Sequence, residues 1–129
     1  MAIVKQLTVT LENRPGVLAA LCSELAKLAV NINAIHVGDT KPLSPVRLVV
    51  SHLDVAKRVC DTLKLKYVEE DVLAVKVGDR PGSLGRITRK LAEKGINVDC
   101  AYGSIAKGSS QALIVLQVSD IAAAERLVR

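Results

Sequence analysis

Two short loops in this chain carry residues whose types and spacing suit the binding of a small charged molecule. Each loop reads Asn or Asp and then Arg-Pro-Gly, and it runs into apolar residues at helical spacing. A helix N-terminus offers free N–H groups and partial positive charge to a carboxylate, and glycine admits a ligand close to the backbone. The Asn or Asp side chain can accept a hydrogen bond from an ammonium group. The loops therefore complement both charged groups of an amino acid.

The arginine of each loop is a further candidate, because a guanidinium can pair a carboxylate through two parallel hydrogen bonds. It could instead be solvated or join a neighbouring acid, and the whole loop could be no more than a turn and a helix start. The candidate ligand-binding residues of the loops are Asn13, Arg14, Pro15, Gly16, Val17 and Leu18, and Asp79, Arg80, Pro81, Gly82, Ser83 and Leu84.

Two asparagines open the strand expected after each helix. Asn31 and Asn97 either contact a ligand across a module interface or are turn residues that bond their own backbone. Asn33 and Asp99, two residues on, share a strand face with them and are weaker candidates. His36 and Tyr102 occupy equivalent positions and are expected on the same apolar face as Ile32 and Val98, either packed or in contact with a ligand.

Catalytic and metal-binding patterns are missing from the sequence. His36 and His52 are the two histidines, and no catalytic triad spacing, Walker loop or GxGxxG is present. The cysteines at 22, 60 and 100 are odd in number and far apart, which argues against a disulfide framework and against zinc. We therefore expect no enzyme, no catalytic or metal-ligating residues and no cofactor, with each cysteine packed as a small apolar side chain.

An internal repeat organises the chain. Asn13–Leu18 recurs as Asp79–Leu84, an offset of 66 residues (79 − 13). At the same offset Leu7 matches Leu73, Val49 matches Val115 and Asp54 matches Asp120, with no gap. We infer from these matches that about half of the chain has been duplicated, with modules at residues 1–70 and 71–129.

Each copy predicts the same order of elements. An alternating strand leads through the loop, with Asn13 or Asp79 as helix cap, to an amphipathic helix, two strands and a second helix capped by Asp54 or Asp120. The expected segments are strands 3–11, 30–37, 46–51 and 65–68 in the first copy and 72–77, 96–102 and 112–118 in the second. The second copy lacks its last strand, and residues 69–71 between the copies are expected to form a solvated linker.

This order predicts an α+β fold of two tandem ferredoxin-like βαββαβ modules, each an antiparallel sheet with its helices on one face. The missing strand of the second copy would leave an unpaired sheet edge in that copy. Such an edge favours association, so either a partner covers it or the natural chain continues.

The composition of the chain limits the classes of partner that the protein is expected to bind. The net charge of +5 is scattered over the sequence, and two Tyr without Phe or Trp leave few aromatic rings to stack on bases, so we expect no nucleic acid. No apolar run approaches the roughly 20 residues of a membrane span, and no signal peptide is recognised, which favours a cytoplasmic protein without membrane contact. Modules of this size bury little surface alone, so a homodimer or a regulatory partner protein is expected.

The segment Glu12–Leu18, followed by Val30–Ile32, resembles the ACT domain family, and Asp79–Leu84 with Gly95–Val98 resembles a second copy. The resemblance covers essentially the whole chain. It implies a stand-alone pair of regulatory modules whose loops, with Asn31 and Asn97, hold an amino acid at the interface between ACT modules. Serine-sensing members carry a histidine two residues before the loop asparagine, where this chain has Leu11 and Val77, so a serine-type contact set is incomplete.

We therefore expect a regulatory small-molecule-binding protein that senses an amino acid. The alternative is a regulatory adaptor subunit that acts through protein–protein contacts with a metabolic enzyme or regulator. The sensor predicts a specific thermal response to a ligand, and the adaptor predicts a stable complex without one.

Overall fold

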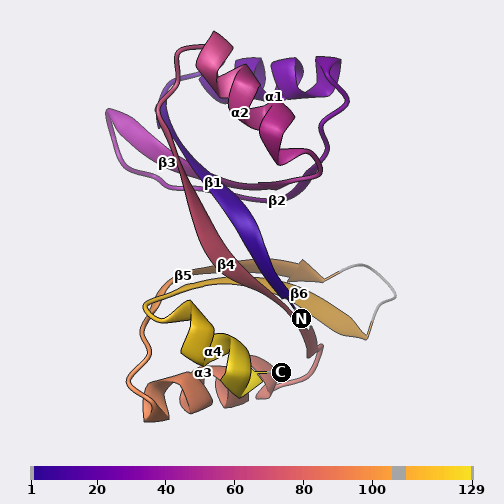
Figure 1. Ribbon diagram of the computed structural model, residues 1–129, viewed down its shortest axis with the longest axis vertical. Helices are drawn as coiled ribbons and strands as arrows, with labels where there is room; N and C mark the ends of the chain where they lie inside the picture. The colour runs from indigo at the N-terminus through magenta and orange to yellow at the C-terminus, as the bar shows by residue number, and fades with distance from the viewer. Residues whose placement is uncertain (1, 106–109, 129) are drawn as a thin grey trace. The chain divides into compact units, whose positions relative to one another are not determined.

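The elements alternate in the predicted order. The computed structural model describes residues 2–105 and 110–128 (Figure 1). Its helices and strands are β1 (Ala2–Glu12), α1 (Val17–Lys27), β2 (Ile32–Val37), β3 (Leu43–Val50), α2 (Leu53–Thr62), β4 (Tyr67–Gly78), α3 (Ser83–Glu93), β5 (Val98–Ile105), β6 (Gln111–Val118) and α4 (Ile121–Val128). The chain divides into two compact units, module one (residues 5–70) and module two (residues 71–128 with 2–4).

Module one is a βαββαβ unit with strand order β2-β3-β1-β4 and antiparallel pairing of β3 with β1 and β2. Helices α1 and α2 cover one face of this sheet (Figure 1). Alternate residues of β1, Leu7, Val9 and Leu11, point to that face because side chains of a strand alternate, and they pack against Leu21 of α1 and Val59 of α2. The predicted α+β, ferredoxin-like fold is confirmed.

Module two repeats this layout with strand order β5-β6-β4 and with α3 and α4 against one face. As predicted, its own described residues, 71–128, end in a helix and supply no last strand. Within the described residues, the edge that the missing strand would leave unpaired is nevertheless occupied. Residues 2–4 of β1 belong to module two, and β1 is the neighbour of β4 in the strand order. The start of the chain thus occupies the position of the missing strand.

Strand β4 corrects the prediction of a solvated linker. It is one strand from Tyr67 to Gly78, so residues 69–71 lie inside it, and only the second half of the short strand predicted at 65–68 belongs to it. Acidic residues are poor strand formers, but here the two glutamates have partners on β1 and α2. Glu69 Oε1 accepts a hydrogen bond of 2.9 Å from Lys57 Nζ, and Thr8 Oγ1 donates one of 2.8 Å to Glu70 Oε1. Lys5 Nζ lies 3.7 Å from Glu69 Oε2.

The offset between equivalent residues of the two modules changes in the second half of each module. Leu7 pairs with Leu48 in module one and Leu73 pairs with Leu116 in module two, so the third strands are 68 residues apart rather than 66. The hairpin of the second and third strands is therefore two residues longer in module two, where β5 (Val98–Ile105) is longer than β2 (Ile32–Val37). The ungapped matches of Val49 with Val115 and Asp54 with Asp120 were wrong.

The change in offset decides which residues cap α2 and α4, the second helices of the two modules. Asp120 caps α4 as predicted, through its Oδ1, which accepts from the N–H of Ala123 at 3.1 Å. Asp54 does not cap α2, because that helix begins at Leu53 and His52 is its N-cap residue. His52 is the residue that matches Asp120 at the corrected offset.

A register shift in β2 also changes which face His36 occupies. Ile32 pairs with Val50 in the helix-side core, whereas beyond the irregularity at Asn33 His36 pairs with Arg47. Arg47 neighbours the buried Leu48, so it and His36 lie on the helix-free face. Arg47 Nη1 is 3.4 Å from His36 Nδ1. The prediction that His36 shares a face with Ile32 was wrong, and the same shift between Val98 and Cys100 separates Tyr102 from Val98.

The cysteines are free thiols. Cys60 is packed in the core of module one, where burial raises the pKa of its thiol, and Cys22 and Cys100 are half-buried. A raised pKa keeps the Cys60 thiol protonated and unreactive at neutral pH. Across residues 2–105 and 110–128, no helix has the length and apolar character needed to cross a membrane.

The ion pairs of Glu69 predict a pH dependence of stability. The hydrogen bond and charge of Lys57, together with the charge of Lys5, hold the pKa of Glu69 below its ordinary value of 4.5. A depressed carboxyl pKa adds stability that is present above the unfolded value and is lost as pH falls through the folded value. We expect Glu69→Gln to lower the unfolding temperature at neutral pH, with the difference shrinking below about pH 4.5.

Thermal unfolding of both proteins from pH 3 to pH 8 measures this difference, with the exposed Glu93→Gln as the matched control. A Glu69→Gln difference that stays constant across the whole range would show that the carboxylate charge does not hold the centre of β4.

Candidate functional site

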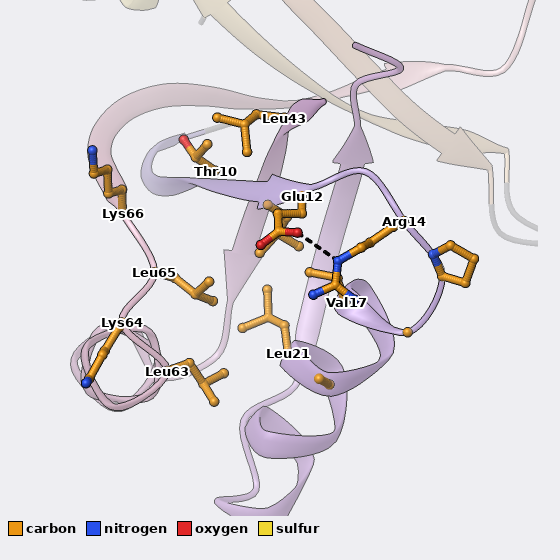
Figure 2. Close-up of a pocket in the computed structure, with 14 residues that line it drawn as sticks. Thr10, Glu12, Arg14, Val17, Leu21, Leu43, Leu63, Lys64, Leu65 and Lys66 are labelled. Carbon is orange, nitrogen blue, oxygen red and sulfur yellow. Dashed lines mark hydrogen bonds and ion pairs between the residues drawn. The ribbon is translucent and has the colours of Figure 1, made fainter. Parts of the chain in front are cut away.

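A cavity of about 670 Å³ lies in module one, at the end where β1 leads into α1 (Figure 2). Three segments that are distant in sequence form its walls: the end of β1 with the following loop, the first turns of α1, and the connection from α2 to β4. Leu43, at the start of β3, also lines it. Its size is within the range of small-molecule sites, roughly 300–1,000 Å³.

Part of the predicted first loop lines this cavity. Arg14, Pro15, Gly16 and Val17 are in the lining, whereas Asn13, Leu18 and Asn31 are not. Sequence reasoning missed the other lining residues, chiefly Glu12 and the α2–β4 connection, residues 63–66. Glu12 lies two positions before Arg14, a spacing that could have marked it. The connection lies some fifty residues further along the chain and carries no motif.

An ion pair stands in the cavity. Arg14 Nε donates a hydrogen bond of 2.7 Å to Glu12 Oε2, and both side chains point toward the interior in Figure 2. The two side chains are 63% and 61% exposed, so their attraction is screened and contributes no more than about 1 kcal/mol. The pair can therefore open to a ligand at little expense in free energy. The carboxylate of Glu12 is complementary to the ammonium group of an amino acid, and the guanidinium of Arg14 is complementary to its carboxylate.

Gly16 shapes the start of α1. It is the N-cap residue with φ of 89°, and a Cβ placed there would meet nothing within 4 Å, so the constraint on this position is purely conformational. Gly82 repeats this geometry, also with φ of 89°, at the start of α3. Neither helix has a side-chain cap, so the prediction that Asn13 and Asp79 cap them was wrong. The first N–H groups of α1 thus have no side-chain partner at the cavity.

Asn13 instead fixes the connection between β2 and β3. Its backbone N–H donates to Pro42 O at 2.8 Å and its side-chain Nδ2 donates to Thr40 O at 3.0 Å. These bonds hold Leu43, a lining residue, beside the end of β1. The backbone N–H of Asp79 likewise donates to Ser110 O at 2.8 Å, but a carboxylate has no N–H for the second bond.

The opposite wall is the turn that ends α2. Leu65 N–H donates to Cys60 O at 2.9 Å while Lys64 has φ of 58°, which together are the hydrogen bond and left-handed residue of a Schellman cap. Thr10 N–H then donates to Lys66 O at 2.9 Å and ties this wall to β1. The side chains of Leu63 and Leu65 face the cavity, whereas Lys64 and Lys66 extend away from it (Figure 2).

The two asparagines predicted as ligand contacts are held in matching bonds. Asn31 Nδ2 donates to Asn33 Oδ1 at 2.9 Å, and Asn97 Nδ2 donates to Asp99 Oδ1 at 2.7 Å. The backbone N–H groups of the two asparagines donate to the hydroxyls of Ser51 and Ser119. In both modules, the arrangement closes the turn before the second strand.

The loop of module two has the same backbone with different side chains. Gly78 stands where module one has Glu12, and a Cβ there would lie 3.5 Å from Arg80 Nε and 3.4 Å from Ser83 Oγ. Arg80 therefore lies close to the bare backbone of Gly78 instead of pairing with a carboxylate. Ser83 is 7% exposed and its hydroxyl has no hydrogen-bond partner. Pro81, Gly82 and Leu84 are exposed.

No group of three or more His, Cys, Asp or Glu side chains that could hold a metal ion is found within residues 2–105 and 110–128. The polar side chains of the lining are thus Glu12, Arg14 and Thr10, together with Lys64 and Lys66, whose ammonium groups extend away from the cavity (Figure 2). This set can bind a small zwitterion by charge and hydrogen bonding.

The sequence and the fold are similar to those of known proteins. Residues 5–59, most of module one, match the ACT domain family. The chain is similar in structure to protein BT0572 from Bacteroides thetaiotaomicron, with a TM-score of 0.90 at 23% identity over 97% of this chain and 85% of that one. No curated protein matches the sequence.

Two further solved structures have the same fold. They are the regulatory subunit of aspartate kinase from Thermus thermophilus in its ligand-free form (TM-score 0.70, 14% identity, 96% of this chain and 88% of that one) and its counterpart from Thermus flavus (TM-score 0.66, 16% identity, 99% and 92%). At these identities the likeness extends to the fold alone.

The left-handed helix ends predict a stability test. Ala29 and Lys64 take φ of 59° and 58°, a conformation that suits glycine, which Gly95 supplies at the position in module two that matches Ala29. We expect Ala29→Gly and Lys64→Gly each to stabilise the protein by about 0.5–1 kcal/mol and Gly95→Ala to destabilise it by a similar amount.

Urea denaturation of the three variants measures these changes. A Cβ at Gly95 would meet nothing within 4 Å, so its result isolates the backbone effect. Loss of stability in Lys64→Gly would mean that the lysine side chain, rather than its backbone, holds this wall of the cavity.

Proposed function

We propose that the protein is a regulatory small-molecule-binding protein that senses an amino acid. The observation that carries this proposal is the cavity in which Glu12 and Arg14 stand beside the start of α1 and a set of leucine side chains. A carboxylate, a guanidinium and the start of a helix without a side-chain cap complement an α-ammonium and an α-carboxylate. The match of residues 5–59 to the ACT family supports the same proposal.

The repeat allows the proposal to be extended from module one to the whole chain. We regard the chain as a pair of ACT modules without catalytic activity, acting in the cytoplasm as a homo-oligomer or on a metabolic enzyme. The similar structures named as regulatory subunits of aspartate kinase are consistent with this role. Binding would regulate only if the ligand has different affinities for two conformations or assembly states of the protein.

The proposal predicts a selective thermal response. With each of the twenty amino acids added in turn to the full chain, we expect one or a few to raise the unfolding temperature. Saturation at 100 times Kd should add roughly 2.7 kcal/mol to stability. Because Arg14 would pair the ligand carboxylate, Arg14→Ala should remove most of this response, and the exposed Arg89→Ala of α3 should retain it.

The outcomes separate the sensor from the adaptor. A response that is the same in Arg14→Ala and the unmodified chain would place the ligand elsewhere in the protein. No response to any amino acid, together with a stable complex in pull-downs, would overturn the sensor and favour an adaptor that acts through protein–protein contacts.

A further inference from the structure

We propose that module one selects an α-amino acid with a branched aliphatic side chain, held as a zwitterion by Glu12 and Arg14 with its side chain against Leu21, Leu63 and Leu65. This inference rests on the proposed function and names the ligand class of the same cavity. It also assigns Glu12 and the α2–β4 connection to the binding site.

The ion pair leaves its outer atoms unused. Arg14 and Glu12 bond through Nε and Oε2, at 2.7 Å. Within the described residues, no other hydrogen bond engages either side chain, so both terminal NH2 groups of Arg14 and Oε1 of Glu12 are available. The NH2 groups suit a carboxylate and Oε1 suits an ammonium. A zwitterion can thus bind both residues without first displacing a buried partner.

The space beside the pair is apolar. Leu11 and Leu21 are buried at 3% and 1% exposure, and Val17, Leu63 and Leu65 are partly buried around them. In Figure 2 Val17, Leu21, Leu63 and Leu65 surround the space from the helix side and the connection side. A ligand side chain placed here would bury apolar surface, and a polar one would lose its bonds to water without replacement. Lys64 and Lys66 extend away and offer it no partner.

Module two lacks the same features at matched positions. Gly78 replaces Glu12, Ser83 replaces Val17 and Arg86 replaces Ala20, all at the offset of 66. At these positions module two therefore has neither the carboxylate of Glu12 nor the two apolar side chains of α1, and its own acid, Asp79, matches Asn13, which does not line the cavity. The proposal accordingly requires one ligand per chain.

Titration calorimetry of the full chain tests the ligand class. Leucine, isoleucine and valine should bind at one site per chain, with glycine weaker by at least about tenfold, since one methylene in an apolar pocket changes affinity about 10- to 200-fold. Serine, aspartate and lysine should bind no better than glycine. Leu65→Ala should weaken leucine at least about tenfold while leaving glycine, which does not reach that wall, nearly unchanged.

The role of Glu12 is tested separately, with a ligand that lacks the ammonium group. 4-Methylpentanoate is leucine without the ammonium group, so it should bind the unmodified chain more weakly than leucine does. Glu12→Gln keeps the shape of the side chain and removes its charge. It should weaken leucine about tenfold or more, as expected for a lost charge-assisted bond, and leave 4-methylpentanoate unweakened. Glu93→Gln, an exposed change on α3, is the matched control, and unfolding temperatures verify that each variant is folded.

The results distinguish the two levels of the proposal. Binding of a polar amino acid in preference to leucine would overturn the aliphatic class and leave the sensor intact. Equal weakening of leucine and 4-methylpentanoate by Glu12→Gln would overturn the role of Glu12 as the ammonium partner. Two sites per chain would overturn the assignment to module one alone. Absence of binding by any amino acid would overturn both this inference and the proposed function.

Discussion

Pairing of β1 with β4 is the contact on which both modules depend, because each of these strands supplies residues to both. The centre of β4 is Glu69-Glu70-Asp71, a sequence that has little preference for a strand. Lys5 of β1 and Lys57 of α2 neutralise Glu69, and Thr8 of β1 bonds Glu70, so both glutamates have partners inside module one. Since residues 2–4 of β1 belong to module two, the same strand also lies beside β4 in that module.

The cavity follows from this pairing. Thr10 donates to Lys66 just before β4 begins, and this bond brings the end of α2 to the end of β1. Leu63 and Leu65 then face Val17 and Leu21 of α1. The backbone conformations at this site are demanding, with Gly16 at φ of 89° and Lys64 at φ of 58°, whereas the Glu12–Arg14 pair is exposed and weak. The scaffold is therefore fixed, and the charged groups remain free to change partners.

Much of this could be predicted from the sequence, because local patterns determine it. The repeated loop, the helices and the order of the strands follow from apolar spacing and from Pro-Gly placed before the first helix of each module. Features that depend on pairing partners could not be predicted. Residues 69–71 look like a linker until Lys57 and Thr8 are placed beside them. The change in offset from 66 to 68 and the register shift at Asn33 are visible only when strands pair, and they moved Asp54 and His36 to unexpected positions.

The site shows the same division between local and distant effects. Arg14 and Gly16, predicted from the loop motif as ligand contacts, line the cavity because it includes the loop that follows β1, whereas Asn13 of the same motif bonds the backbone of Thr40 and Pro42. The duplication makes the distinction sharper. Gly16 and Gly82 have the same φ and begin helices of the same length, so the backbone of the loop is common to both modules. Glu12 against Gly78 and Val17 against Ser83 are differences in side chain alone. A motif that is repeated in sequence thus specifies the turn in both copies, and the chemistry of each copy is set by neighbours that the motif does not include.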